Sequence, residues 1–388
     1  MRVAFIHNDK RIGTGAHHIN GLMSSKLKER SVQVKNFYPK VSLIEPPSHL
    51  KGLANILFFY SLLEHKNQVL KYSLVQGTTY SPLPFLAFNI PVVSHFGSTT
   101  KGFLDATPLA VNMEKEVQKV WYQLRKEGVL SEVNIRTRRP MRDIAEIEEY
   151  VASRANAVIA TSEKVKQELI GSGVEEEKIQ VLHNAIEDYW FERPLSEILS
   201  SPRIVFLGRL GKDAFTLKLK GFDRLVHLYL RFKDTPKTAI YMSTHPKLKD
   251  WMKNNFGAYQ SFVNMRKDLI PKVLHPLRGS ILFLPSRYEG FSLSLIEGMS
   301  QGLIPVAYPV GVVPEVIRDG ENGYIVHSQR EAIARVEEIL SNEDARLSMS
   351  REAYATAQQF KGDILAEKLG EYYQTVLDSS KNNQSELS

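Results

Sequence analysis

The chain has 388 residues, of which 24% are charged and 43% hydrophobic, the balance of an ordinary globular protein. This composition excludes chain-wide disorder and fibrous or collagen-like proteins, and the length predicts two domains. Cysteine is absent, which excludes disulfide frameworks, thiol nucleophiles and zinc–thiolate sites. No apolar run reaches the roughly 18–20 residues of a membrane span, and the apolar run at 3–6 is too short for a signal peptide. We therefore expect a cytoplasmic protein.

The net charge of +7 is unevenly distributed along the chain. Residues 201–280 contain 16 Lys or Arg and 5 acidic residues. Such a basic segment indicates either an anionic partner, such as phosphate, nucleic acid or a membrane surface, or a solvated cationic face. Aromatic residues are not interleaved with these cations as stacking on nucleic acid bases requires, so we expect no nucleic-acid partner.

Short apolar runs alternate with amphipathic stretches in the first half of the chain. Apolar runs without strict alternation, separated by helices, indicate a parallel sheet that is covered on both faces. We expect strands at residues 3–7, 31–38, 72–76, 91–95 and 157–161, and helices at residues 16–30 and 163–170.

The same alternation restarts after residues 184–202, which contain two prolines and no clear period and are interpreted as a linker. We expect strands at residues 204–207, 238–242, 281–284 and 304–308, helices at 221–232, 292–300, 331–340, 344–359 and 363–377, and a disordered polar tail at 379–388.

The sequence thus predicts an α/β protein with two doubly wound parallel-sheet domains, at residues 1–190 and 191–360. The remaining residues, 361–388, are expected to form a helix that crosses back to the first domain, followed by the tail. Ligands of such sheets bind beyond the carboxyl ends of the strands, so the cleft between the domains is the expected site.

Two familiar phosphate-binding motifs fail. Gly13-Thr14-Gly15 follows the first strand, but His18 replaces the third glycine of a dinucleotide fingerprint and no acid follows about 20 residues later. Residues 97–102 resemble the start of a P-loop, but Phe103 stands where the lysine must be. What remains at residues 13–15 is a turn whose bare backbone can approach an anion at a helix N-terminus, or a plain tight turn.

The segment at residues 284–302 is more informative. It runs from a buried strand through a loop into a helix, with Glu289 on the loop and Glu297 inside the helix. Backbone N–H groups from Gly290 to Leu293 are exposed at the helix start, where the helix dipole favours phosphate. Two carboxylates beside an anion site suit a ligand that also carries hydroxyls. Paired Glu residues are common by chance, but the glycine-flanked strand–loop–helix context makes this pair specific.

This segment resembles the E-x7-E motif of retaining GT-B glycosyltransferases of family GT4. Other stretches resemble further family elements in the family's order, and the similarity covers nearly the whole chain. They are Phe206-Leu207-Gly208-Arg209 with Lys220-Gly221-Phe222-Asp223, and residues 157–162, 181–187, 311–315 and 319–323. The resemblance implies the GT-B fold, in which two Rossmann-like domains face each other across a cleft. The first domain would bind the acceptor and the second the nucleotide-sugar donor.

The resemblance also implies roles for individual residues. Arg209 and Lys220 would contact the donor's diphosphate and neutralise charge as the sugar–phosphate bond breaks. Glu289 would hold hydroxyls of the donor sugar, and Glu297 the hydroxyls of the ribose. The donor-binding backbone is expected at Gly13, Thr14, Gly15, Gly290, Phe291, Ser292 and Leu293.

Alternatives stay open for the role of His95 and for the identity of the lysine that would contact the diphosphate. His95 ends a strand where the family often has a histidine near the donor sugar, although a histidine at a strand end is often structural. Ten residues separate Arg209 from Lys220, so Lys212 or Lys218 competes for the role of Lys220, and the Gly-Phe-Asp that follows favours Lys220.

The implied function is the transfer of a hexosyl group from a UDP- or GDP-sugar to an acceptor hydroxyl with retained configuration, in the synthesis of a cell-envelope polysaccharide, glycolipid or related glycan. The acceptor would be a glycan, a lipid-linked sugar or a small molecule. No D-x-D motif is evident, and neither a cofactor nor an obligatory metal is expected. The rivals are a nucleotide-sugar epimerase and a non-catalytic partner subunit, against which the intact Arg209, Lys220, Glu289 and Glu297 argue.

An amphipathic stretch at residues 113–130 mixes apolar residues with four cations. One interpretation is peripheral attachment to the inner face of an anionic membrane that carries a lipid-linked acceptor. The other is an ordinary packed helix, and the sequence leaves both open.

Overall fold

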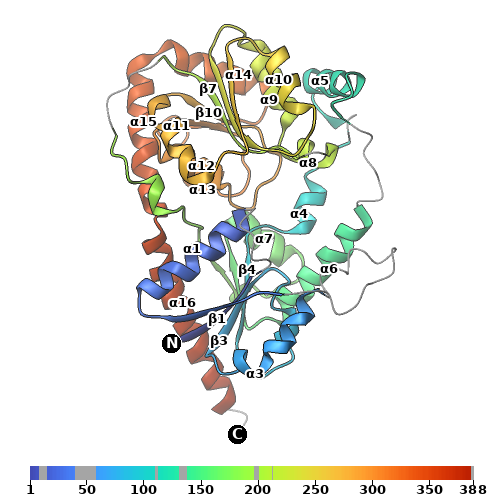
Figure 1. The fold of residues 1–388 in the computed structure, drawn as a ribbon, viewed down its shortest axis with the longest axis vertical. Coiled ribbons are helices and arrows are strands. Elements are labelled where there is room, and N and C mark those ends of the chain that lie inside the picture. Colours follow the sequence, from blue (N-terminus) through green and yellow to red (C-terminus); the bar gives the residue numbers. More distant parts are fainter. Residues whose placement is uncertain are drawn as a thin grey trace. The chain divides into compact units, whose positions relative to one another are not determined.

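A computed structural model of the chain describes residues 1–7, 15–39, 58–109, 112–130, 138–195, 201–211 and 213–385. The chain forms two compact units, and each contains a six-stranded sheet in which every pair of neighbouring strands is parallel (Figure 1). Helices connect the strands and flank both sheets. The predicted architecture of two doubly wound α/β domains is confirmed.

Unit 1 comprises Met1–Leu104, Ile135–Ile186 and Phe360–Ser388. Its strand order is β2-β1-β3-β4-β5-β6. The strands are β1 (Arg2–Ile6), β2 (Gln33–Phe37), β3 (Leu74–Thr78), β4 (Val92–Phe96), β5 (Ala157–Ala160) and β6 (Ile179–Val181). The helices are α1 (Gly15–Glu29), α3 (Lys66–Val69), α4 (Thr100–Asp105), α6 (Arg138–Arg154), α7 (Glu163–Gly171) and α16 (Gly362–Ser385), with short 3-10 helices η2 (Tyr60–His65), η3 (Leu83–Phe85) and η6 (Glu176–Lys178).

Helices cover both faces of this sheet, so its central strands are buried on both sides. All residues of β3, β4 and β5 are buried. On one face, Tyr373 of α16 donates a hydrogen bond to Gln76 of β3, and α16 also packs along α1. On the other face, Val165 and Leu169 of α7 join the apolar core.

Unit 2 comprises Asp105–Asn134 and Glu187–Gln359, and its strand order is β12-β11-β10-β7-β8-β9. The strands are β7 (Ile204–Arg209), β8 (Lys237–Met242), β9 (Tyr259–Val263), β10 (Ile281–Leu284), β11 (Ile304–Ala307) and β12 (Tyr324–Ile325). The helices are α5 (Lys115–Lys126), α8 (Ala214–Leu219), α9 (Phe222–Arg231), α10 (Leu248–Asn255), α11 (Ile270–Leu274), α12 (Leu293–Met299), α13 (Val313–Val316), α14 (Gln329–Ser341) and α15 (Glu343–Ala357), with 3-10 helices η7 (Asp188–Trp190), η8 (Lys267–Leu269), η9 (His275–Leu277) and η10 (Gln358–Phe360).

The segment Asp105–Asn134 belongs to unit 2, although its place in the sequence puts it inside the expected first domain. Helix α5 packs on α9, and its apolar side is buried in the core of unit 2. The buried residues of α5 are Val117, Val120, Trp121 and Leu124. The amphipathic stretch is therefore a packed helix. Because the unit's own core already covers this apolar side, the argument for membrane attachment through it is lost.

The expected disordered tail at residues 379–388 is wrong for most of its length, because α16 continues to Ser385 and only residues 386–388 lie outside the described part. No glycine or proline interrupts this stretch, and the hydroxyl of Ser380 donates a hydrogen bond to the carbonyl oxygen of Val376. A polar composition is thus compatible with helix when the preceding turns are anchored by packing.

Candidate active site

The carboxyl ends of two adjacent strands of unit 2 bring three of the expected donor-site residues into one region. Arg209 ends β7 and is exposed, and among the described residues no carboxylate pairs with it. Lys220 follows α8 directly, and Glu289 lies on the loop after β10. Lys220 Nζ lies 2.6 Å from Glu289 Oε1, and the side chains are 22% and 18% exposed. Ser286 Oγ donates to the same carboxylate oxygen at 2.8 Å.

The structure distinguishes two of the three competing lysines, Lys218 and Lys220. Lys218 is buried, and its ammonium group lies 3.2 Å from the carbonyl oxygen of Pro108 and 4.8 Å from the ring centre of Trp121. Lys220 instead reaches the loop that carries Glu289. Lys212 lies outside the described residues. The geometry favours Lys220 over Lys218 as the lysine that faces a ligand at the strand ends.

Gly221 allows the Lys220 turn to lie directly on the loop after β10. Its φ of 64° lies in the left-handed region, and a Cβ built on it would stand 1.9 Å from the carbonyl oxygen of Pro285. Any side chain here would collide with backbone, which has nowhere to move. The close approach explains why a glycine follows Lys220.

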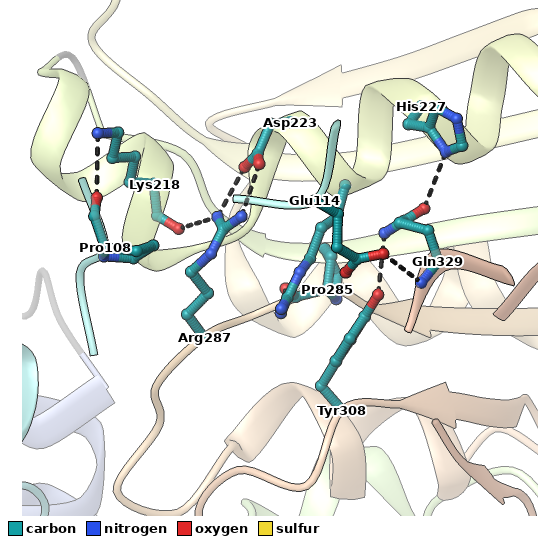
Figure 2. A network of polar contacts seen from close by, with 10 residues as sticks. Pro108, Glu114, Lys218, Asp223, His227, Pro285, Arg287, Tyr308 and Gln329 are labelled. Atoms are coloured by element: carbon teal, nitrogen blue, oxygen red, sulfur yellow. Dashed lines mark hydrogen bonds and ion pairs between the residues drawn. The ribbon is translucent and has the colours of Figure 1, made fainter. Parts of the chain in front are cut away.

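A buried ion pair joins the first turn of α9, just after Gly221, to the loop that follows β10 (Figure 2). Arg287 donates two hydrogen bonds to Asp223, at 2.7 and 2.6 Å, and a third at 2.8 Å to the carbonyl oxygen of Lys218. The side chains are 7% and 0% exposed. The backbone N–H of Arg287 also donates to the carbonyl of Leu219. Such a pair is strongly directional, so it fixes the position of the Glu289 loop relative to Lys220.

A second cation, Arg224, follows Asp223 on α9, and its guanidinium carbon lies over the ring of Tyr308, the residue after β11, 3.7 Å from the ring centre. Burial lowers the pKa of Arg224, with Tyr308 acting in the opposite direction. The Tyr308 hydroxyl accepts a hydrogen bond from Gln329, which also contacts His227 of α9 (Figure 2). The arrangement ties α9 and α14 to the loop that follows β11.

Glu297 is buried on α12 and forms an ion pair with Lys267, 3.0 Å away. Lys267 also contacts both carboxylate oxygens of Glu187, at 3.0 and 2.9 Å. Burial alone would lower the pKa of Lys267, but the charges of Glu297 and Glu187 outweigh it and the pKa is raised. The pKa of Tyr189 is raised, mainly by burial and in addition by the charges of Glu187 and Glu297. Lys267 and Glu187 were not among the expected site residues, although Lys267 lies in the basic segment 201–280 and Glu187 ends the motif-like stretch 181–187.

The loop from Gly290 to Leu293 has an unusual backbone. Ser292 has a φ of 86°, a left-handed conformation that non-glycine residues rarely adopt. Gly311, with a φ of 54°, lies against this loop, and a Cβ there would stand 2.8 Å from the carbonyl oxygen of Phe291. The neighbouring Val312 N–H donates to the same oxygen at 3.1 Å. The loop is therefore held in place from outside, which leaves its N–H groups preorganised.

In unit 1, His95 lies on β4 and is buried. Burial lowers its pKa to about 4, while a hydrogen bond with Asn184 acts in the opposite direction. The imidazole is therefore neutral at neutral pH. Gly15 is the first residue of α1, whereas Gly13 and Thr14 lie outside the described residues. The roles of these residues remain predictions.

Within the described ranges, no group of three or more His, Asp or Glu side chains has the arrangement of a metal site. In the same ranges, every helix is too short or too polar to span a bilayer.

Two family profiles match the chain. "Glycosyltransferase Family 4" covers residues 24–188, and "Glycosyl transferases group 1" covers residues 200–356. Together they account for both parallel-sheet domains, and the strand-end cation and carboxylates of unit 2 lie within the second match. The chain belongs to the family 4, or group 1, glycosyltransferases.

Among curated relatives, alpha-maltose-1-phosphate synthase of Mycolicibacterium smegmatis is 26% identical over 262 residues, which are 59% of this chain and 66% of that protein. The chain spans about half to two thirds of the length of the curated relatives that it matches first.

Among solved structures, sucrose-phosphate synthase from Thermosynechococcus elongatus has a TM-score of 0.72 at 14% identity, over 97% of this chain and 99% of that chain. Anabaena HepE in complex with UDP-glucose has a TM-score of 0.64 at 15% identity, over 97% and 100% of the two chains. At these identities the similarity establishes a shared fold.

Proposed function

We propose that the protein is a retaining glycosyltransferase that moves a hexosyl group from a nucleotide diphosphate sugar to an acceptor hydroxyl. The observation that carries the proposal is the contact between Lys220, which follows α8, and Glu289, on the loop after β10, with the exposed Arg209 at the carboxyl end of the adjacent strand β7. This one region of unit 2 offers cations for a diphosphate and a carboxylate for sugar hydroxyls, the two chemical parts of such a donor.

The cations would act when the bond between the sugar and the diphosphate breaks. Negative charge then develops on the departing phosphate, and Arg209 and Lys220 would stabilise it without a metal ion. The phosphate would take the proton of the acceptor hydroxyl while the new bond to the anomeric carbon forms on the same face. Lys220 already pairs with Glu289, so the diphosphate would share the ammonium group and release Glu289 oxygens for the sugar.

The remainder of the donor has matching partners in unit 2. The carboxylate of Glu297 would accept hydrogen bonds from the ribose hydroxyls, and the N–H groups around Phe291 and Leu293 would support the phosphates. In unit 1, the neutral imidazole of His95 would both donate and accept, which suits sugar hydroxyls better than a fixed charge does.

The solved structure of HepE contains UDP-glucose, so a UDP-sugar is the first donor to test, followed by GDP- and ADP-sugars. For the acceptor, we propose a glycan, a lipid-linked sugar or a small polyol, because all present the same hydroxyl nucleophile. A role in cell-envelope polysaccharide or glycolipid synthesis follows as a proposal.

A thermal-shift screen of UDP-, GDP- and ADP-sugars identifies the donor, because a ligand that binds only the native state raises Tm. Lys220→Met and Glu289→Gln are then compared with Lys249→Met, which removes an exposed cation from α10. We expect the first two variants to lose transfer while remaining folded, and the third to keep it. Near-normal turnover in either site variant would refute the assignment, and sugar isomerisation without any acceptor would indicate an epimerase instead.

A further inference from the structure

The segment Asp105–Asn134 contacts the lysine-bearing end of α8. The ammonium group of Lys218 is held between the carbonyl oxygen of Pro108 and the face of Trp121, at 3.2 and 4.8 Å. The side chain is only 6% exposed. A buried ammonium needs such partners, because desolvation without them is costly. Lys218 therefore depends on a segment more than 90 positions earlier in the sequence.

The backbone of Lys218 is held as firmly as its side chain. Its carbonyl oxygen accepts hydrogen bonds from Arg287, at 2.8 Å, and from the N–H of Gly221, at 3.0 Å. Lys220 lies between Lys218 and Gly221, and its own N–H donates to the carbonyl of Thr216 at 3.0 Å. The turn that presents Lys220 is thus fixed on both sides, and one of its supports is the Lys218 side chain.

The supporting segment is itself anchored to unit 2 at several points. Glu114 accepts a hydrogen bond from the N–H of Gln329 at the start of α14 (Figure 2). Glu127 accepts one from Trp251 of α10, and the carbonyl oxygen of Val129 lies 2.6 Å from the ring of His245. The described part of the segment is thus joined to the rest of unit 2 by Glu114, Glu127 and Val129.

We propose that Lys218 and Trp121 are positioning residues, which hold Lys220 where it meets the donor's diphosphate. The segment that carries Trp121 thereby acts in donor binding, without touching the donor. The inference rests on the proposed function, since it concerns the residue that would bind the diphosphate.

The test measures the affinity of the full-length protein for UDP and UMP, or for the GDP–GMP or ADP–AMP pair if the screen selects another base. Under the proposed function, Lys220 would contact the departing phosphate, which is the second phosphate of the nucleotide, so a displaced Lys220 should weaken binding of the diphosphate and spare that of the monophosphate. We expect Lys218→Met to weaken UDP binding about tenfold while changing UMP binding less than twofold, the size expected for one lost charged contact. Lys218→Arg, which keeps the charge, should restore most of the loss.

A double-mutant cycle and a neighbouring control sharpen the result. If Lys218 acts through Lys220, Lys218→Met has no further effect on UDP binding once Lys220→Met is present. Tyr122→Leu removes an aromatic side chain that is 46% exposed beside Trp121 and should leave the ratio of the two affinities unchanged. If Lys218→Met does not fold, Trp121→Phe is used in its place. We expect Trp121→Phe to weaken UDP binding relative to UMP binding in the same way, but by a smaller factor.

Two outcomes separate the inference from the function on which it rests. If UDP, GDP and ADP all fail to bind the wild type, the proposed function and the inference both fail. If the wild type binds a diphosphate, but Lys218→Met and Trp121→Phe weaken it no more than the monophosphate, the side chains only support the fold and the inference is overturned.

Discussion

Glu148 on α6 is a buried carboxyl group whose ionisation should destabilise unit 1 as the pH rises. Its oxygens accept hydrogen bonds from the N–H and the hydroxyl of Thr100, at 2.7 and 2.8 Å, at the start of α4. Burial raises its pKa to about 7, with Thr100 acting against the shift and Glu149 and Glu168 adding to it. The native state therefore keeps a proton that the unfolded chain loses near pH 4.5.

The sign follows from the protons bound in each state. Between the two pKa values the native state binds more protons than the unfolded state, so stability falls as the pH rises through this range. The loss is complete only above the native pKa. A shift from 4.5 to about 7 corresponds to a destabilisation of about 2–3 kcal/mol between pH 5 and pH 8.

Glu148→Gln tests this reasoning, because glutamine can still accept from the Thr100 N–H and donate to its hydroxyl but cannot ionise. Urea unfolding at pH 5 and pH 8 measures the free energy of unfolding of each protein. We expect the variant to gain about 2–3 kcal/mol on the wild type at pH 8 relative to pH 5. Glu146→Gln, an exposed position on the same helix, is the control. An equal pH dependence in Glu148→Gln and the wild type would refute the reasoning.

Three further predictions concern unit 2. Gly221→Ala should cost more than 3 kcal/mol in urea unfolding, because its Cβ would collide with backbone 1.9 Å away; a loss below 1 kcal/mol would contradict this. Arg287→Met should cost about 3–5 kcal/mol, because it leaves the carboxylate of Asp223 buried and unpaired, and Arg287→Met with Asp223→Leu should recover most of that loss. Lys267→Met should weaken binding of UDP more than that of 2′,3′-dideoxy-UDP if Glu297 accepts hydrogen bonds from the ribose as proposed, because Lys267 forms an ion pair with Glu297 and holds its carboxylate in place; equal losses for both nucleotides would exclude this role.

Much of the fold could be predicted because a buried parallel strand is marked in the sequence by a short run of neighbouring apolar residues. The strands β1, β4, β5, β7 and β10 each appear as a short apolar run, and the structure places them within one or two residues of the expected bounds. The strands β6, β9 and β12 were missed, since each lies at the edge of its sheet and is short or only partly buried. Partial burial at a sheet edge removes the apolar run on which the prediction depends.

For α5, the sequence predicts the buried side of the helix but not the domain against which that side packs. Its spacing of apolar residues predicts that one side is buried, and the structure buries Trp121 and Leu124. The spacing contains no information about which surface covers that side. Packing of α5 on α9 joins positions about 100 residues apart, so only the tertiary structure could assign the segment to unit 2.

In the candidate site, too, residues that lie in a local sequence pattern could be predicted, and a residue whose contacts are distant in sequence could not. Glu289, Glu297 and Lys220 could be proposed as site residues from the sequence because each lies in a local pattern of strand, loop, glycine and helix. Lys267 was not among them, because its ion pair with Glu297 joins the short helix η8 to α12, and a contact between residues 30 positions apart produces no periodic pattern in the sequence.

A local sequence pattern does not say which way a side chain points, and the choice between Lys218 and Lys220 depends on that direction. The two residues are identical in type and two positions apart, so composition and spacing treat them alike. At the end of a helix, however, two positions correspond to a rotation of about 200°. One ammonium group therefore points into the core toward Trp121 while the other reaches Glu289. The helical phase, set by the Asp213 cap at the start of α8 and by Gly221 after its end, decides which lysine is available to a ligand.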